Sequence, residues 1–140
     1  MAYDDSNIFA RILRGELPAH KVYEDGETLA FLDIMPRADG HCLVIPRTPC
    51  VNTLDASPAQ LASTIATVQR IARAAMTAFE AEGIKVEQYN EAPSGQVVLH
   101  LHFHVLPCWS GVTLRPPGKM ADGELLRRHA EQLRKVLGTG

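Results

Sequence analysis

An apolar run late in the chain carries three histidines at alternate positions. It reads Val97-Val98-Leu99-His100-Leu101-His102-Phe103-His104-Val105-Leu106. Successive side chains of an extended strand point to opposite faces of a sheet, so the three imidazoles are predicted to share one face and the apolar residues the other. The run therefore predicts a strand with one face in a core and one face available for chemistry.

Length and composition indicate one globular domain, which we place at residues 1–140. The chain is long enough to bury a core, and its 46% hydrophobic and 21% charged residues are ordinary for a globular protein. The 14 basic and 16 acidic residues give a formal charge of -2. This balance predicts no broad surface for nucleic acid or for an anionic membrane.

The cysteines and the N-terminus predict a location in the cytoplasm. Cys42, Cys50 and Cys108 are odd in number and form no Cys-x-x-Cys pair, which argues against a disulfide framework. The first six residues are acidic and do not resemble a signal peptide. No apolar run approaches the roughly 20 residues that span a bilayer, so we expect no membrane segment.

Turn and cap signals divide the chain into alternating elements. Ser6 is a candidate N-cap for a short helix that ends before Gly15, and Asp25-Gly26 is a hairpin signal. Ser57-Pro58 starts a long helix that Gly83 ends, and Asp122 is a candidate cap for a last helix. We expect strands at 21–24, 28–33, 41–46, 84–89 and 97–107, with a turn from Asn90 to Gly95.

Each of the two longer helices carries an apolar stripe at spacings of three and four, which predicts one buried face per helix. The stripe of the long helix comprises Leu61, Ile65, Val68, Ala72, Ala75 and Phe79, and that of the last helix Leu125, Leu126, His129, Leu133, Val136 and Leu137.

The order of these elements predicts an α+β domain. An antiparallel sheet of about five strands would have helices packed against one face and the histidines on the other. A sheet of this size leaves edges and apolar surface exposed, and we expect a homodimer to cover them.

Three interpretations of the histidine face are open from the residues alone. The histidines are incidental polar residues, or ligands of a metal ion, or nucleophilic catalysts. Same-face neighbours on a strand lie roughly 6.5 to 7 Å apart, so two of them reach one ion easily and three only with strain. Neutral imidazole is a good nucleophile at neutral pH.

The residues around this run resemble the histidine triad (HIT) family. The run from His100 to Leu106 matches its His-φ-His-φ-His-φ-φ signature, in which φ is apolar. Segments upstream match in the same order, so the resemblance covers residues 6–107, with 108–140 as a C-terminal loop and helix. The upstream segments are Ser6 to Ile12, Gly15 to Ala19, Val22 to Asp25, Leu29 to Ile34 and Gly40 to Pro46.

The resemblance implies a hydrolase or transferase acting on the α-phosphate of a purine nucleotide conjugate. His102 would attack the phosphorus and form a covalent nucleotidyl-histidine. His100 would orient it through its backbone carbonyl, and His104 would assist charge or proton transfer. His41 matches the remaining family histidine.

The resemblance also implies which residues bind the substrate. Asp33 would receive the ribose hydroxyls. Asn90, Gly95 and Gln96 match the phosphate-binding turn, in which Gly95 allows close backbone approach and Gln96 donates a hydrogen bond. The walls of the base pocket would be Ile8, Phe9, Ile12 and Ile34.

Four departures from the family pattern bear on metal and substrate. Asn7, Ala10 and Pro49 stand where zinc-bearing members carry two cysteines and a histidine, so we expect neither structural zinc nor any cofactor. The turn from Asn90 to Gly95 is one residue shorter than usual. Cys108 replaces a common basic residue. Val97 stands where phosphoramidases commonly carry serine, which tilts the chain slightly away from a dedicated phosphoramidase and leaves dinucleoside polyphosphate hydrolysis open.

The sequence thus predicts an enzyme that uses His102 without a catalytic metal. Two rivals remain: a metal-dependent hydrolase on the same histidines, and a nucleotide-binding module without catalysis.

Overall fold

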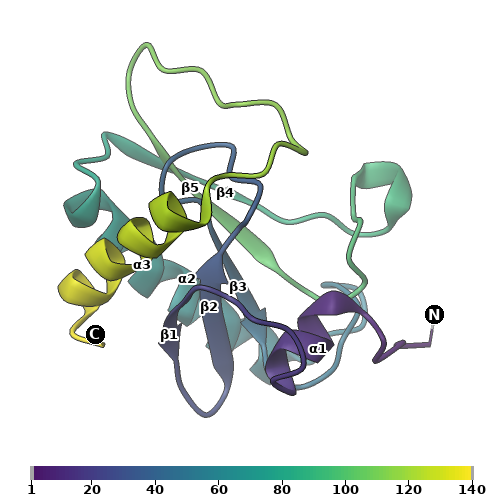
Figure 1. Cartoon of the computed structure of the whole chain (residues 1–140). Coiled ribbons are helices and arrows are strands. Elements are labelled where there is room, and N and C mark those ends of the chain that lie inside the picture. The colour runs from purple at the N-terminus through teal and green to yellow at the C-terminus, as the bar shows by residue number, and fades with distance from the viewer. Residues whose placement is uncertain (1, 140) are drawn as a thin grey trace.

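The computed structural model describes residues 2–139 and is built around one sheet (Figure 1). Among these residues, no helix has both the length and the apolar character to cross a bilayer. The described elements are α1 (Ile8–Leu13), β1 (Lys21–Glu24), β2 (Thr28–Leu32), β3 (Cys42–Pro46), α2 (Pro58–Ala78), β4 (Gly83–Glu87), the short 3-10 helix η1 (Ala92–Ser94), β5 (Phe103–Cys108) and α3 (Gly123–Leu137).

The described strands form a five-stranded sheet in the order β1-β2-β3-β5-β4, with every neighbouring pair antiparallel. The predicted α+β fold is therefore confirmed. The pairing of β3 with β5 joins two segments far apart in sequence and sets Leu43 opposite His104. This register brings the segment that carries His41 beside the triad.

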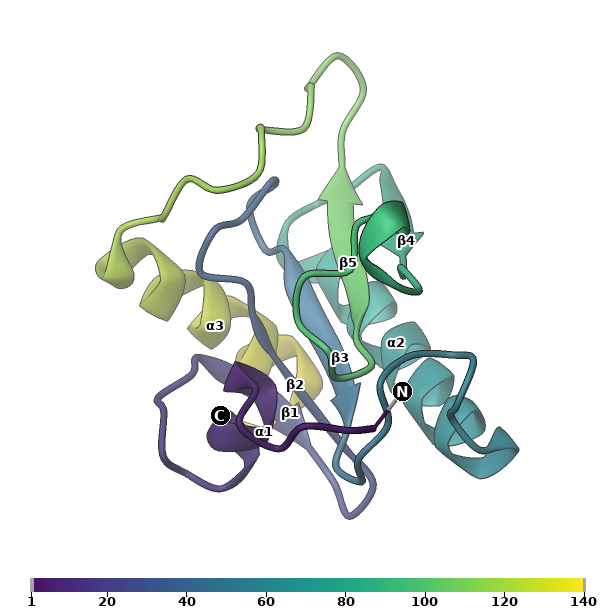
Figure 2. The same cartoon turned by 90° about the vertical axis from the view of Figure 1, so that its right-hand side faces the viewer.

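Side chains that alternate along the strands build two separate cores. Ala30, Val44 and Val105 belong to the core under α2 and α3. Leu29, Phe31 and Leu43 point to the opposite face and pack with residues of α1. Figure 2 shows α1 in front of the sheet and both longer helices behind it. The two longer helices pack on one face as predicted, and the short α1 covers apolar residues of the second face.

The first helix is capped one residue later than predicted. Asn7 is the N-cap, and its Oδ1 accepts from the backbone N–H groups of Phe9 at 3.0 Å and Ala10 at 2.9 Å. Ser6 instead donates its hydroxyl to Asp4 at 2.6 Å. Asn7 and Ala10 occupy two positions where zinc-bearing family members carry cysteine, and here one caps α1 while the other is buried in it.

The long helix begins as predicted but ends earlier, and its buried face is shifted from the predicted stripe, of which Val68 and Ala75 are buried. Ser57 forms a capping box with Gln60, and Phe79 rather than Gly83 marks the end. Ile65, assigned to the stripe, is 48% exposed, whereas Ile71 is fully buried. Two threonines explain the rotation, since hydrogen bonds to the carbonyl of Gln60 and to Thr28 allow Thr64 and Thr67 to lie in the core.

The last helix matches its predicted position. Asp122 is the N-cap residue, although its side chain makes no capping hydrogen bond. Leu126 and Leu133 are buried, but Val136, also in the predicted stripe, is 43% exposed. Near the C-terminus the hydroxyl of Thr139 donates to the carbonyl of Val22 on β1 at 2.8 Å.

The strand boundaries differ most at β5. The predicted strand 97–107 begins only at Phe103, and β2, β3 and β4 are also shorter than the predicted 28–33, 41–46 and 84–89. Pro46, at the end of β3, has no N–H for a ladder, and its carbonyl is bonded by the His100 ring at 2.9 Å. Leu101 N–H donates to Cys50 instead of to β3. His100 and His102 therefore precede the strand, and only His104 lies in it.

Candidate active site

The ring of His100 is fully buried and bonded at both nitrogens. Nε2 lies 2.9 Å from the carbonyl oxygen of Pro46, and Nδ1 lies 2.6 Å from the hydroxyl of Tyr3. A carbonyl only accepts, so the proton of the neutral ring is on Nε2. Its side chain is thus committed to structure, and its backbone carbonyl remains to orient a neighbour.

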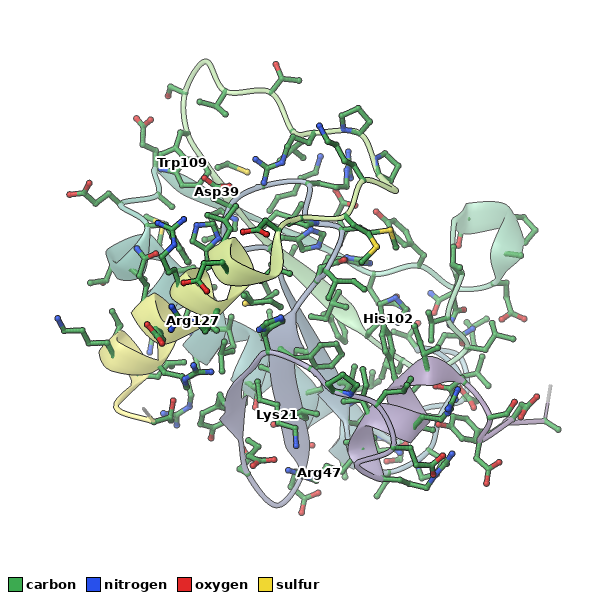
Figure 3. The ribbon with its side chains drawn as sticks, viewed as in Figure 1. Lys21, Asp39, Arg47, His102, Trp109 and Arg127 are labelled. Carbon is green, nitrogen blue, oxygen red and sulfur yellow. The ribbon has the colours of Figure 1, made fainter. Side chains whose placement is uncertain are left out.

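The ring of His102 is oriented by that carbonyl. Nδ1 of His102 lies 2.7 Å from the carbonyl oxygen of His100 and must donate to it. In the neutral ring Nε2 then carries a bare lone pair. The Phe9 ring meets His102 edge to face, with centroids 4.9 Å apart, and Figure 3 shows His102 on the α1 side of the sheet. This is the arrangement that a nucleophilic imidazole requires.

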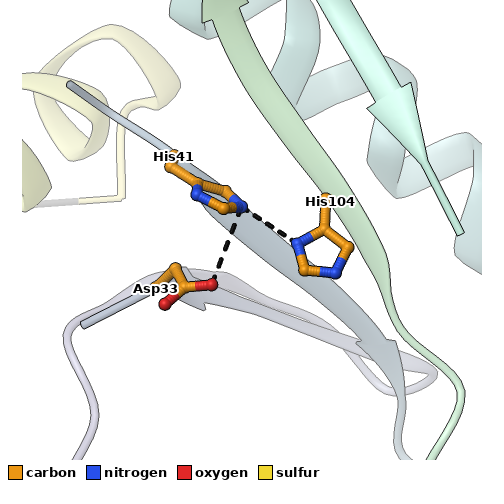
Figure 4. A group of neighbouring side chains, drawn as sticks. All are labelled: Asp33, His41 and His104. Atoms are coloured by element: carbon orange, nitrogen blue, oxygen red, sulfur yellow. Dashed lines mark hydrogen bonds and ion pairs between the residues drawn. The ribbon is translucent and has the colours of Figure 1, made fainter. Parts of the chain in front are cut away.

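A second pair of histidines, His41 and His104, is held in the opposite arrangement of donor and acceptor nitrogens. The backbone N–H of Arg37 donates to Nδ1 of His41 at 3.1 Å, so the neutral His41 ring carries its proton on Nε2. That Nε2–H points at Nδ1 of His104, 3.0 Å away, as Figure 4 shows. His104 therefore accepts at Nδ1 and keeps its own proton on Nε2. The rings of His102 and His104 have centroids 5.2 Å apart, which sets a lone pair and an N–H side by side.

The environment keeps these rings neutral. Burial lowers the pKa of His41 to about 3, aided by His104 and by the guanidinium groups of Arg37 and Arg115. Burial likewise lowers the pKa of His104 to about 4. It lowers the pKa of His100 to about 4 and also lowers that of His102.

Asp33 lies beside the second pair. One carboxylate oxygen accepts from the N–H of Met35 at 2.8 Å, and the other lies 3.7 Å from Nε2 of His41. Burial raises the pKa of Asp33. The ribose-binding role remains a prediction, and the structure places this carboxylate next to the catalytic candidates.

Asp33, His41 and His104 bring three possible metal-ligand atoms within 4.8 Å of one another. A metal at Nε2 of His41 would need the lone pair of that nitrogen. The N–H of Arg37 already takes the lone pair at Nδ1, so the proton occupies Nε2. The hydrogen bonds thus favour a proton on Nε2 of His41 over an ion at this cluster.

The predicted base-pocket residues divide into two groups. Phe9 and Ile12 are buried and belong to the core under α1. Ile8 and Ile34 are 48% and 44% exposed, which is unusual for large apolar side chains, and they remain available to a ligand. The apolar surface available for a base is therefore smaller than predicted.

The buried side chain of Gln96 anchors the turn before the triad through hydrogen bonds. Gln96 donates to the carbonyls of Val51 and Val98 and accepts from Asn52 and from the N–H of Glu91. The two bonds that Gln96 donates use both N–H groups of its amide and so compete with the predicted donation to a phosphate. Gln96 is thus an anchor of the turn in this structure.

Two other turn residues stay near the surface. Gly95 is exposed and has φ of 113°, a conformation that favours glycine. Asn90 accepts from the N–H and the hydroxyl of Thr53 at 2.9 and 2.8 Å. Sequence reasoning missed Asn52 and Thr53 as partners, because the loop that carries them has no motif of its own.

The shortened turn has a strained residue. Glu91 has φ of 73° and ψ of 155°, a backbone conformation that residues other than glycine rarely adopt. Its carboxylate accepts from the Asn52 amide at 2.7 Å, and its N–H donates to Gln96 at 2.8 Å. These two bonds hold Glu91 in this conformation.

A separate cavity of about 250 Å³ lies between the loop that follows β2 and the loop that follows β5. Trp109 and Asp39, two of its lining residues, lie away from His102 in Figure 3. None of the predicted site residues lines this cavity.

Comparison with known proteins agrees with this geometry. A family model described as HIT domain matches residues 14–110. The chain belongs to the HIT family. A crystal structure of a Hit-like protein from Bartonella henselae is 47% identical, with a TM-score of 0.91 over 96% of this chain and 99% of that one.

Two curated HIT-family relatives have named activities. The adenosine 5'-monophosphoramidase HNT1 of Candida albicans is 31% identical over 98% of this chain and 95% of its own length. The adenylylsulfatase HINT3 of Arabidopsis thaliana is 32% identical over 87% of this chain and 68% of its own length. These names describe two leaving groups, an amine and a sulfate.

Proposed function

We propose that this HIT-family chain is a nucleotide hydrolase or transferase that cleaves a purine nucleotide conjugate at its α-phosphate through a nucleotidyl-His102 intermediate. The observation that carries the proposal is the hydrogen bond from His102 Nδ1 to the carbonyl of His100, which leaves Nε2 free to attack. The named activities of two relatives support the substrate class.

In the first step, the Nε2 lone pair of His102 forms a bond to the α-phosphorus, and the bond from phosphorus to the leaving group breaks. The leaving group departs with the bonding electrons, and an amine leaving group also takes up a proton from solvent. The His102 ring becomes a cation, which the His100 carbonyl stabilises at Nδ1. The Nε2–H of His104 donates to the charged phosphoryl group.

In the second step, water attacks the same phosphorus and the nitrogen–phosphorus bond breaks. The bonding electrons return to Nε2 of His102, and the proton of the water is released to solvent, while the Nε2–H of His104 continues to donate to the phosphoryl group. The products are a nucleoside monophosphate and the original enzyme, so the histidines act as catalysts.

Intact-protein mass spectrometry tests the intermediate directly. The chain is mixed with adenosine phosphoramidate, adenylyl sulfate or a diadenosine polyphosphate and quenched without acid. We expect a nucleotidyl adduct on the parent chain and on His20→Ala, a control outside the triad, but none on His102→Ala. Equal turnover by His102→Ala would refute the proposal, and the fastest substrate identifies the leaving group.

We further propose that the enzyme is a homodimer. β4 is an edge of the described sheet, and Val86 on it is 46% exposed; α2 also exposes the large apolar side chains of Met76 and Ile65. An unpaired strand edge and exposed apolar side chains suit a second copy of the chain. Light scattering should give twice the chain mass for the parent and a monomer for Met76→Glu, and a monomeric parent would contradict the proposal.

A further inference from the structure

Tyr3 contacts the triad from outside the segment that the family model matches. Its hydroxyl lies 2.6 Å from Nδ1 of His100, and the two rings meet edge to face with centroids 5.6 Å apart. The side-chain amide of Asn7 donates to the same hydroxyl at 3.0 Å. Sequence analysis assigned Tyr3 no role, because one tyrosine in an acidic terminal segment has no pattern around it.

The direction of each hydrogen bond follows from the two groups with a fixed role, the carbonyl of Pro46, which accepts, and the amide of Asn7, which donates. Pro46 can only accept, so His100 carries its proton on Nε2 and has a lone pair at Nδ1. The Tyr3 hydroxyl must then donate to Nδ1, and its oxygen accepts from Asn7. His100 is thereby held at both ring nitrogens in one tautomer and one orientation.

The segment that carries Tyr3 is itself fixed to α1. The carbonyl of Asp4 accepts from the side-chain amide of Asn7 at 2.8 Å. The guanidinium of Arg14 donates to the carbonyl of Asp5 at 2.8 Å. The hydroxyl of Tyr3 is therefore presented to His100 by a braced segment.

We propose that Tyr3 is a positioning residue for the nucleophile, acting through His100 on His102. The proposal rests on the proposed function for its catalytic consequence. When the hydroxyl is absent, Nδ1 of His100 is free to take a proton, and the ring can rotate. A charged His100 beside His102 would oppose the cation that forms on His102 during attack. A rotated His100 would move the carbonyl that fixes the nucleophilic tautomer.

Tyr3→Phe removes only the hydroxyl and tests the proposal. We expect kcat and the rate of adduct formation to fall about tenfold, the effect of one lost hydrogen bond at a site, with little change in KM. The acid limb of the pH profile should move to higher pH, because His100 then protonates more readily. Tyr23→Phe is the matched control, since Tyr23 bonds Asp25 on another part of the sheet, and it should retain parent kinetics.

A spectroscopic readout separates positioning from general support of the fold. The ¹⁵N shifts of His100 in the parent should show protonated Nε2 and hydrogen-bonded Nδ1, and Tyr3→Phe should shift Nδ1 while its circular dichroism stays unchanged. This readout needs no substrate, so it stands even if no nucleotide is cleaved. Parent-like kcat in Tyr3→Phe, or a parent spectrum with a proton on Nδ1 of His100, would overturn the proposal.

Discussion

Two pairs of histidines form the candidate site, and they are anchored with opposite polarity. In the pair of His100 and His102, each ring donates to a backbone carbonyl, that of Pro46 or that of His100. The Nε2 lone pair of His102 is therefore left facing the site. In the pair of His41 and His104, each ring accepts at Nδ1, from the N–H of Arg37 or from the Nε2–H of His41. His104 therefore has an Nε2–H that faces the site. Histidine thus supplies both a nucleophile and a hydrogen-bond donor. A backbone carbonyl fixes the tautomer of the first pair, and a backbone N–H fixes that of the second.

The strongest test of this difference removes, from each pair, the ring that faces the site, His102 or His104. His102→Ala should lose at least about 10⁴-fold in kcat, because no other group can form the intermediate. His104→Ala should lose about 10² to 10³-fold, because it removes a donor to the transition state while the adduct can still form. Quenched kinetic assays measure kcat of both variants, and intact-protein mass spectrometry measures whether each forms the adduct. If His104→Ala formed no adduct while His102→Ala did, the assignment of the two pairs would be reversed.

A milder test interrupts the second pair one ring further back. His41→Phe keeps a ring but removes the Nε2–H that fixes His104, so His104 can place its proton on Nδ1 and lose its donor. We expect kcat to fall about tenfold, by the loss of one hydrogen bond, with the adduct still detectable. His129→Phe, on α3 against Phe79, is a control that should leave kcat unchanged. Unchanged kcat in His41→Phe would show that His41 does not fix the tautomer of His104.

Acid should affect stability through both pairs. The unfolded chain takes up protons on histidine near the ordinary pKa of 6.5, whereas His100 and His104 in the folded protein do so only near 4. Stability is therefore complete above about pH 6.5 and falls as the pH drops toward 4. Asp33, whose pKa burial raises, opposes this trend only at the acid end. Thermal melting across this range measures the slope, and a flat profile would show that the rings are not held neutral.

The smallest predicted effect concerns the turn that completes the site. Glu91→Ala and Glu91→Gly both lose the bond to Asn52, but only glycine relieves the backbone conformation. Glu91→Gly should therefore be more stable than Glu91→Ala by about 1 kcal/mol or more, measured by denaturant unfolding. Equal stability of the two variants would show that the turn is unstrained.

The sequence predicted the triad and most elements because these depend on local pattern. It assigned Ile65 rather than Ile71 to the core because hydropathy ignores the bonds that let Thr64 and Thr67 be buried. It extended β5 back to Val97 because alternation alone does not reveal that Pro46 ends the ladder.

The family resemblance matched His41 to a family histidine, but its contact with His104 and the direction of their hydrogen bond depend on the fold and on Arg37, which no motif marks. Gln96 and Tyr3 show the same limit. The first was predicted to meet a ligand and bonds the protein instead, and the second had no predicted role yet contacts His100. Polar partners that lie far apart in sequence are chosen by the tertiary fold, so their pairing is invisible to spacing.

The neutral histidines have a consequence for how an anion is held. Arg37 and Arg115 lie close to carboxylates of Glu87 and Asp39, at 3.9 and 3.1 Å, so the surroundings add little unbalanced positive charge. A phosphate at this site would be met by N–H dipoles instead of cations. Such recognition is short in range and is weakly screened by dissolved ions. Substrate capture should then vary little with ionic strength, and the anionic monophosphate would leave without a strong electrostatic hold.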